Sequence, residues 1–72
     1  MTSGVWRGSG HHTKLLPYPV NEFCCIIEGV VRIEGADGRV QTFRPGDAFV
    51  LAKGTVCAWH QDGEVLKTYV VF

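Results

Sequence analysis

The sequence predicts an all-β fold built from about seven short strands. Residues that favour turns recur about every eight to twelve positions, a spacing typical of β-sandwiches and β-barrels. The segments between these turns are rich in β-branched and aromatic side chains, which favour strands. No segment combines helical spacing with capping residues over a useful length. The 72 residues contain no internal repeat or linker, so one domain is expected.

The first expected strands follow a leader rich in glycine and serine, which is a candidate for a mobile segment. Lys14–Val20 contains two prolines, and proline cannot donate to a central ladder. We therefore expect an edge or irregular strand there. Glu22–Glu28 and Val30–Gly35 flank Gly29 and are expected to pair with each other.

Two turn signals organise the middle of the chain. Asp37 and Gly38 form a strong hairpin signal between Val30–Gly35 and the next expected strand, Arg39–Arg44, because glycine tolerates the positive φ of such turns. The sequence Pro-Gly-Asp at positions 45–47 predicts the next turn, since proline presets φ at the second turn position. Ala48–Ala52 is the strand expected after it.

Two further strands complete the expected set. These are Val56–His60 and Val65–Phe72, separated by the turn-like segment Gln61–Glu64. The last strand is β-branched and aromatic to its end, and an unpaired apolar edge of that kind recruits partners. A homodimer with strand or sheet contact through the termini is therefore expected.

The charge balance excludes some classes of partner. Seven basic and seven acidic residues give no electrostatic reason to expect nucleic acid or an anionic membrane. No segment approaches the ~20 apolar residues of a membrane span, and the start of the sequence lacks the apolar run of a signal peptide. The three cysteines are an odd count, and two of them are neighbours. A cytoplasmic protein with reduced thiols is the expectation.

Two spaced motifs resemble those of a known family. Glu22 is followed after six residues by Gly29, which resembles the second half of the first cupin motif. The spacing of Gly46, Gly54 and Cys57 resembles the second cupin motif, with cysteine in place of its histidine. The chain is similar over nearly its whole length to the small single-domain cupins grouped with ureidoglycine aminohydrolases. This resemblance implies a small cupin jelly-roll β-barrel.

The resemblance also implies a metal site, which this sequence does not supply in full. In the family, three histidines and the glutamate hold the metal. The two histidines before Glu22 fall on Leu16 and Tyr18 in one alignment, or on Leu15 and Pro17 in the other. Neither alignment provides a histidine, so no metal and no other cofactor are expected.

Cysteines offer an alternative set of metal ligands. Glu22, Cys24 and Cys57 would favour zinc on ligand softness, and Cys24 shares a strand face with Glu22. Free cysteines are among the most buried residue types and usually act as small apolar fillers. We therefore interpret both thiols as core residues.

Six residues form the candidate ligand-binding set. Glu22 is also the candidate catalytic residue, because a carboxylate buried among apolar groups must be paired, hydrogen-bonded or protonated. Lys67, on an otherwise apolar strand, is its candidate counter-charge. Aromatic and hydroxyl groups would complete a small-molecule pocket. The set consists of Tyr18, Glu22, Cys24, Cys57, Trp59 and Lys67. The histidines are expected at the surface, at positions 11, 12 and 60.

Three functions remain open on the sequence. The first is a cupin with a degenerate metal site that binds a small polar metabolite in the barrel. The second is a cupin enzyme of the lyase, isomerase or aminohydrolase type, with Glu22 as general acid or base and Tyr18 or Lys67 as its partner. The third is an oligomeric partner module whose barrel is filled by side chains. A strongly raised pKa of Glu22 would favour the enzyme.

Overall fold

The computed structural model describes residues 1–72 and contains seven strands and no helix. The all-β prediction is therefore confirmed, and the chain has no helix that could cross a membrane. The strands, in chain order, are β1 (Thr2–His12), β2 (Leu16–Pro17), β3 (Glu22–Glu28), β4 (Val31–Gly35), β5 (Val40–Phe43), β6 (Ala48–Leu51) and β7 (Val56–Val71).

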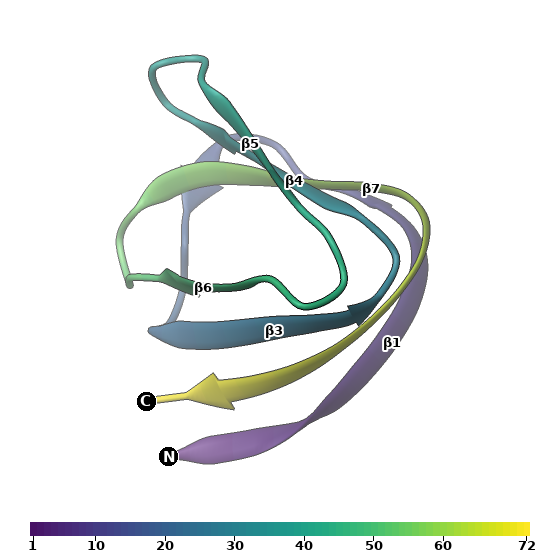
Figure 1. Cartoon of the computed structure of the whole chain (residues 1–72). Helices are drawn as coiled ribbons and strands as arrows, with labels where there is room; N and C mark the ends of the chain where they lie inside the picture. The colour runs from purple at the N-terminus through teal and green to yellow at the C-terminus, as the bar shows by residue number, and fades with distance from the viewer.

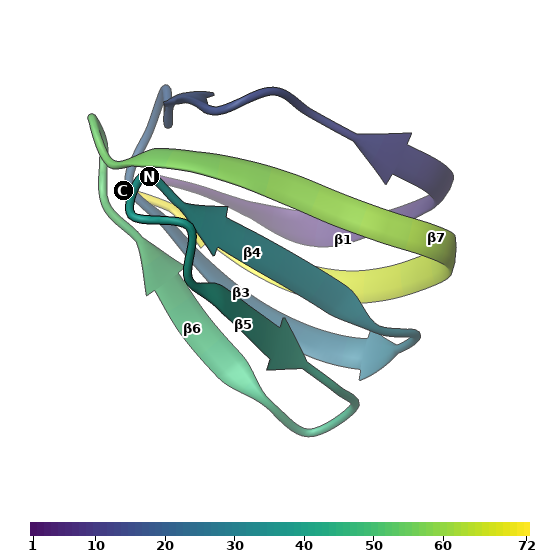
Figure 2. The ribbon, with the colours of Figure 1, turned by 90° about the horizontal axis from the view of Figure 1, so that it is seen from above.

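The strands form one antiparallel sheet that curls around an interior. Its order is β5-β4-β7-β3-β6, and β1 and β2 pair with β7 outside this path. Figure 1 looks into the curled sheet, and the view from above in Figure 2 shows β7 bending around one side of it. Strands β5 and β6 do not pair with each other. Instead, Phe43 and Phe49 stack between them with ring centroids 4.1 Å apart.

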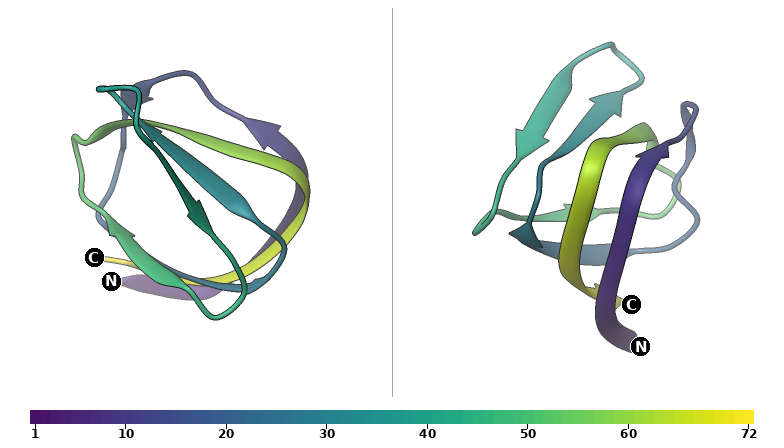
Figure 3. Two further views of the ribbon diagram at one scale, coloured as in Figure 1. Left: turned by 45° about the horizontal axis from the view of Figure 1, so that its top comes forward. Right: turned by 90° about the vertical axis from the view of Figure 1, so that its right-hand side faces the viewer.

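The expected turn at Gln61–Glu64 does not form, and β7 runs unbroken for 16 residues. This single strand takes the place of the two strands expected at Val56–His60 and Val65–Phe72. The long strand forms because β1 follows it through the bend, from Thr2 opposite Val71 to His12 opposite His60. Figure 3 shows the two strands running side by side. Long-range pairing thus overrides the local turn signal.

The N-terminal leader is also a strand, so its interpretation as a candidate mobile segment is wrong. Residues 2–12 form β1, whereas the expected strand at Lys14–Val20 shrinks to the two residues of β2. A side chain at Gly8 would meet the ring of Trp6 at 2.3 Å. The absence of a side chain at Gly8 therefore leaves room for the Trp6 ring to pack over the strand.

The predicted strand positions and turns between Glu22 and Leu51 are confirmed within one or two residues. The expected pairing of β3 with β4 is wrong, because β7 lies between these two strands in the sheet and pairs with both. Gly29, at the turn between β3 and β4, has a φ of +87°, and a side chain there would approach the carbonyl oxygen of Glu64 to 2.2 Å. Only glycine meets both requirements. The turn therefore fits directly against β7.

The apolar core lines the inner face of the curled sheet. It includes both thiols that the sequence placed in the core, and Trp6, Tyr18, Phe43 and Phe49 pack against it. Its buried members are Cys24, Ile26, Val31, Ile33, Leu51, Cys57, Trp59 and Val65.

The end of β7 is not a free edge, which corrects the reason given for a dimer. Val71 pairs with Thr2 of β1 on one side and with Glu22 of β3 on the other. The outer face of the sheet nevertheless exposes apolar side chains, including Phe23 and Val50, which are direct cross-strand neighbours. The homodimer stays a prediction.

Candidate functional site

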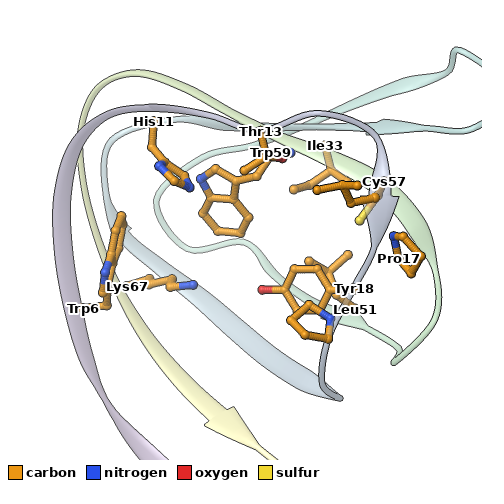
Figure 4. A pocket seen from close by; sticks show the side chains of 12 residues that line it. Trp6, His11, Thr13, Pro17, Tyr18, Ile33, Leu51, Cys57, Trp59 and Lys67 are labelled. Carbon is orange, nitrogen blue, oxygen red and sulfur yellow. Dashed lines mark hydrogen bonds between the residues drawn. The ribbon is translucent and has the colours of Figure 1, made fainter.

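A cavity of about 560 Å³ lies on the inner side of the curled sheet. Figure 4 shows its lining, which brings together residues from both ends of the chain. Four of the six candidate residues line it, namely Tyr18, Cys57, Trp59 and Lys67. Cys24 does not line it. Glu22 lines a second, smaller cavity of about 150 Å³, which shares Trp6 and Lys67 with the first.

Glu22 and Lys67 form a buried ion pair. The Nζ atom of Lys67 lies 2.8 Å from Oε2 of Glu22, and the two residues are only 8% and 7% exposed, respectively. Glu22 begins β3, and Lys67 lies opposite Ile26 of the same strand. Because residues two apart on a strand share a face, Glu22, Ile26 and Lys67 all point to the interior.

Two further donors surround the Glu22 carboxylate. The hydroxyl of Tyr18 donates to Oε1 over 2.7 Å, and the thiol of Cys24 donates to Oε2 over 3.1 Å. Burial raises the pKa of Glu22, but the hydrogen bonds from Lys67, Cys24 and Tyr18 and the charge of Lys67 outweigh it and lower the pKa overall. Glu22 is therefore ionised at neutral pH.

The two neutral donors keep their protons. Burial, and next the hydrogen bond to Glu22, raise the pKa of Tyr18 well above its ordinary value. The same two causes raise the pKa of Cys24 to about 12. Burial alone raises the pKa of Cys57. At neutral pH none of the three is a thiolate or phenolate nucleophile.

The lowered pKa of Glu22 predicts a loss of stability in acid. A carboxyl group with a lower pKa in the folded state stabilises the fold above its unfolded pKa of about 4.3, and this contribution disappears as the pH falls through the folded value. We expect the free energy of unfolding from urea titrations to drop more steeply below about pH 4 in wild type than in the Glu22→Gln, Lys67→Met double variant. Equal slopes for the two proteins would contradict this assignment.

Three aromatic rings surround the ammonium of Lys67. Its Nζ atom lies 4.4 Å from the ring centroid of Trp59, 5.3 Å from that of Trp6 and 5.9 Å from that of Tyr69. These distances fall within the range of cation–π attraction. The indole nitrogen of Trp59 donates to Oε1 of Gln61 over 2.8 Å, which fixes the ring that faces Lys67.

The residues present do not fit the metal that the cupin resemblance implies. Leu16 and Tyr18 of one alignment line the cavity, and so does Pro17 of the other, but none of them is a histidine. Both oxygens of Glu22 already accept hydrogen bonds, and one contacts the cation of Lys67. No group of three or more His, Cys, Asp or Glu residues is placed to hold a metal, so the zinc alternative with Cys24 and Cys57 is not supported either.

The cavity also contains residues that the sequence did not indicate. Trp6, His11 and Thr13 reach it from the N-terminal segment. Thr13 accepts a hydrogen bond from the backbone nitrogen of Trp59 through its hydroxyl oxygen, over 2.8 Å. The available signal was Trp6 between two glycines at i−2 and i+2, a pattern that leaves room for a large ring on one strand face.

His12 and His60, unlike His11, do not line the cavity. His12 and His60 face each other with their Nδ1 atoms 3.0 Å apart, and each contacts an acidic residue through its Nε2 atom. His12 is exposed, and His60 is partly buried. His11 is exposed and also lines the cavity, so it lies at the cavity mouth.

Comparisons with known proteins agree with this architecture. The family model for the EutQ-like cupin domain matches residues 2–69. A crystal structure of a DUF861-family protein of unknown function from Pseudomonas syringae pv. tomato is 31% identical, with a TM-score of 0.93, and the match covers 97% of this chain and 30% of that one. A DUF861-family structure from Thermotoga maritima is 30% identical, with a TM-score of 0.82, and the match covers 96% of this chain and 77% of that one.

A more distant structure shares the fold alone. The EutQ protein of Clostridium difficile is 18% identical, with a TM-score of 0.82, and the match covers 97% of this chain and 54% of that one. The chain thus spans less than a third of the Pseudomonas protein and about half of this one. No curated protein matches the chain. The finer placement with ureidoglycine aminohydrolases stays a prediction.

Proposed function

Because the chain belongs to the EutQ-like cupin domain family, we propose that its curled sheet binds a small polar molecule in the cavity beside Lys67. The observation that carries this proposal is the cavity itself, whose volume of about 560 Å³ is that of a small-molecule site. Its walls are largely apolar and aromatic, and a few polar groups converge on one place, among them the Tyr18 hydroxyl and the Lys67 ammonium. Such a distribution suits ligand binding.

The contacts among Tyr18, Glu22 and Lys67 support a second proposal, acid–base catalysis. Hydrogen bonds join all three side chains, as proton transfer requires. An efficient general base has a pKa near the working pH, however, and that of Glu22 is lowered, away from neutrality. The lowered pKa of Glu22 therefore favours ligand binding over acid–base catalysis as the function of the site. The open volume of the cavity likewise disfavours a partner module with a filled barrel.

A fragment screen by NMR tests the binding proposal. We expect small polar compounds to shift the amide signals around Cys57, Trp59 and Lys67 and the indole signal of Trp59. Cys57→Phe, which places a ring into the cavity, is expected to abolish these shifts because it removes the space that the ligand occupies.

Cys25→Phe is the matched control for this screen. Cys25 points to the opposite sheet face from the cavity, because it neighbours Cys24, whose side chain is fully buried in the core. Its replacement should leave the shifts unchanged. Binding that survives Cys57→Phe, or no binding by any fragment, would contradict the proposal.

A further inference from the structure

We infer that Lys67 is the resident cation of the cavity and that the ligand carries one anionic group on a flat apolar body. This inference rests on the proposed function, and it deepens it by naming the class of ligand. It starts from the charges on the cavity wall. The lining contains one ammonium, that of Lys67, one imidazole, that of His11, and no carboxylate. Glu22 contacts Lys67 but lines only the smaller cavity.

Lys67 has hydrogen-bonding capacity left for a ligand. An ammonium has three N–H donors. The acceptors of Lys67 are Oε2 of Glu22 at 2.8 Å and the sulfur of Cys24 at 3.9 Å, a weak acceptor. The third N–H has no protein acceptor. In Figure 4 the nitrogen points into the cavity, toward the hydroxyl of Tyr18. An anionic oxygen placed there would accept a charge-assisted hydrogen bond.

Glu22 holds this cation in place without closing the cavity. The carboxylate keeps a buried ammonium paired, which offsets much of the cost of its burial. Its negative charge also balances part of the positive charge that a ligand meets. A group with one negative charge, such as a carboxylate, therefore matches the site better than a group with two or more.

The cavity walls specify the rest of the ligand. The Trp59 ring stands beside the Lys67 nitrogen, and its only donor is already bonded to Gln61. Trp6 faces Lys67 from β1, and Ile33 and Leu51 add aliphatic surface. Flat faces of this kind pack against a planar body and offer it few polar contacts.

Lys67 also forms a hydrogen-bonded ion pair with the Glu22 carboxylate, which a bound metal would need as a ligand. Glu22, the one residue that matches the cupin metal ligands, gives an oxygen to the Lys67 ammonium. The positive charge of the cavity is therefore supplied by a side chain, that of Lys67, and not by a bound metal ion. Recognition of the anion should not depend on divalent ions.

Three matched probes test the charge preference of the full chain. Benzoate, benzamide and benzylammonium have similar size and differ in charge, and their binding is followed by NMR titration with and without EDTA. We expect benzoate to bind at least ten-fold more tightly than benzamide, benzylammonium to bind most weakly, and EDTA to have no effect. Equal or tighter binding of benzamide or benzylammonium would overturn the inference and leave the proposed function intact.

Two variants assign the preference to Lys67. Lys67→Met is expected to reduce benzoate binding to the level of benzamide, whereas Lys53→Met, at an exposed lysine, should leave it unchanged. If Lys67→Met does not fold, the Glu22→Gln, Lys67→Met variant removes both charges together and should show the same loss. A benzoate preference that persists in either variant, or that EDTA abolishes, would overturn the inference. Absence of binding by all three probes and by every screened fragment would overturn the proposed function as well.

Discussion

Replacing Lys67 by methionine is expected to lower the free energy of unfolding by about 3–5 kcal/mol, the usual cost of breaking a buried ion pair from one side. The change keeps most of the aliphatic stem and removes the charge, so Glu22 is left in the interior without its counter-charge and with only Tyr18 and Cys24 as donors. Urea denaturation followed by tryptophan fluorescence measures the effect. A loss below about 1 kcal/mol would mean that the pair behaves as a surface salt bridge.

A double-mutant cycle separates the pairing from the other roles of the two residues. Glu22→Gln leaves the ammonium buried without its carboxylate and should also destabilise the fold. The Glu22→Gln, Lys67→Met variant removes both charges, so its loss should be clearly smaller than the sum of the two single losses. Additive losses would show that the two charges do not stabilise each other.

Restoring the family's histidines is expected to create a metal site only if Lys67 is removed as well. Leu16→His, Tyr18→His and Cys57→His supply imidazoles from three residues that line one cavity. Lys67→Met and the loss of the Tyr18 hydroxyl free two of the hydrogen bonds to Glu22. We expect the fourfold variant to retain about one divalent ion per chain after dialysis, because three histidines and a carboxylate form a full ligand set.

Elemental analysis and two controls test this design. The threefold variant that keeps Lys67 should retain far less metal, since its ammonium repels a divalent cation and occupies the carboxylate. Glu22→Gln in the fourfold background should weaken binding. If wild type itself keeps one metal per chain and loses it on Cys57→Ser, a thiolate has replaced the histidine and the interpretation of Lys67 as the resident cation is wrong.

The parts of the fold that the sequence predicted well are those with local determinants. Between Glu22 and Leu51 each strand ends at a glycine or proline turn, and Gly29 shows the positive φ that such a turn requires. The errors lie in β1, β2 and β7, and the position of β7 between β3 and β4 also overturns the expected pairing of those two strands. Gln61–Glu64 has the composition of a turn, yet Gln61 is fully buried and its amide nitrogen donates to the carbonyl oxygens of Gly8 and Gly63. The hydrogen bond to Gly8 depends on a partner more than fifty residues away in the sequence.

The candidate site divides in the same way. Strand alternation and the cost of burying a charge were enough to associate Glu22 with Lys67, because both are charged residues in apolar surroundings. Tyr18 was indicated by its place at a family histidine position and Trp59 by sharing a strand face with Cys57, and both line the cavity. The glycines on either side of Trp6 indicated room for a large ring, but no local pattern indicated that Trp6 and Thr13 reach the cavity. Trp6 is placed there by the pairing of β1 with β7, and Thr13 by its backbone hydrogen bond to Trp59.

The length of β7 also bears on how quickly the chain can fold. This strand, the last of the seven, is the pairing partner of β1, β2, β3 and β4. Before it emerges from the ribosome, the first two strands have no partner, and only the short ladders of β3 with β6 and β4 with β5 can form. Thr2 must then find Val71 across nearly the whole sequence. Closure between such distant segments loses chain entropy before contacts repay it, so refolding belongs in the slow, millisecond-to-second class of β-rich domains.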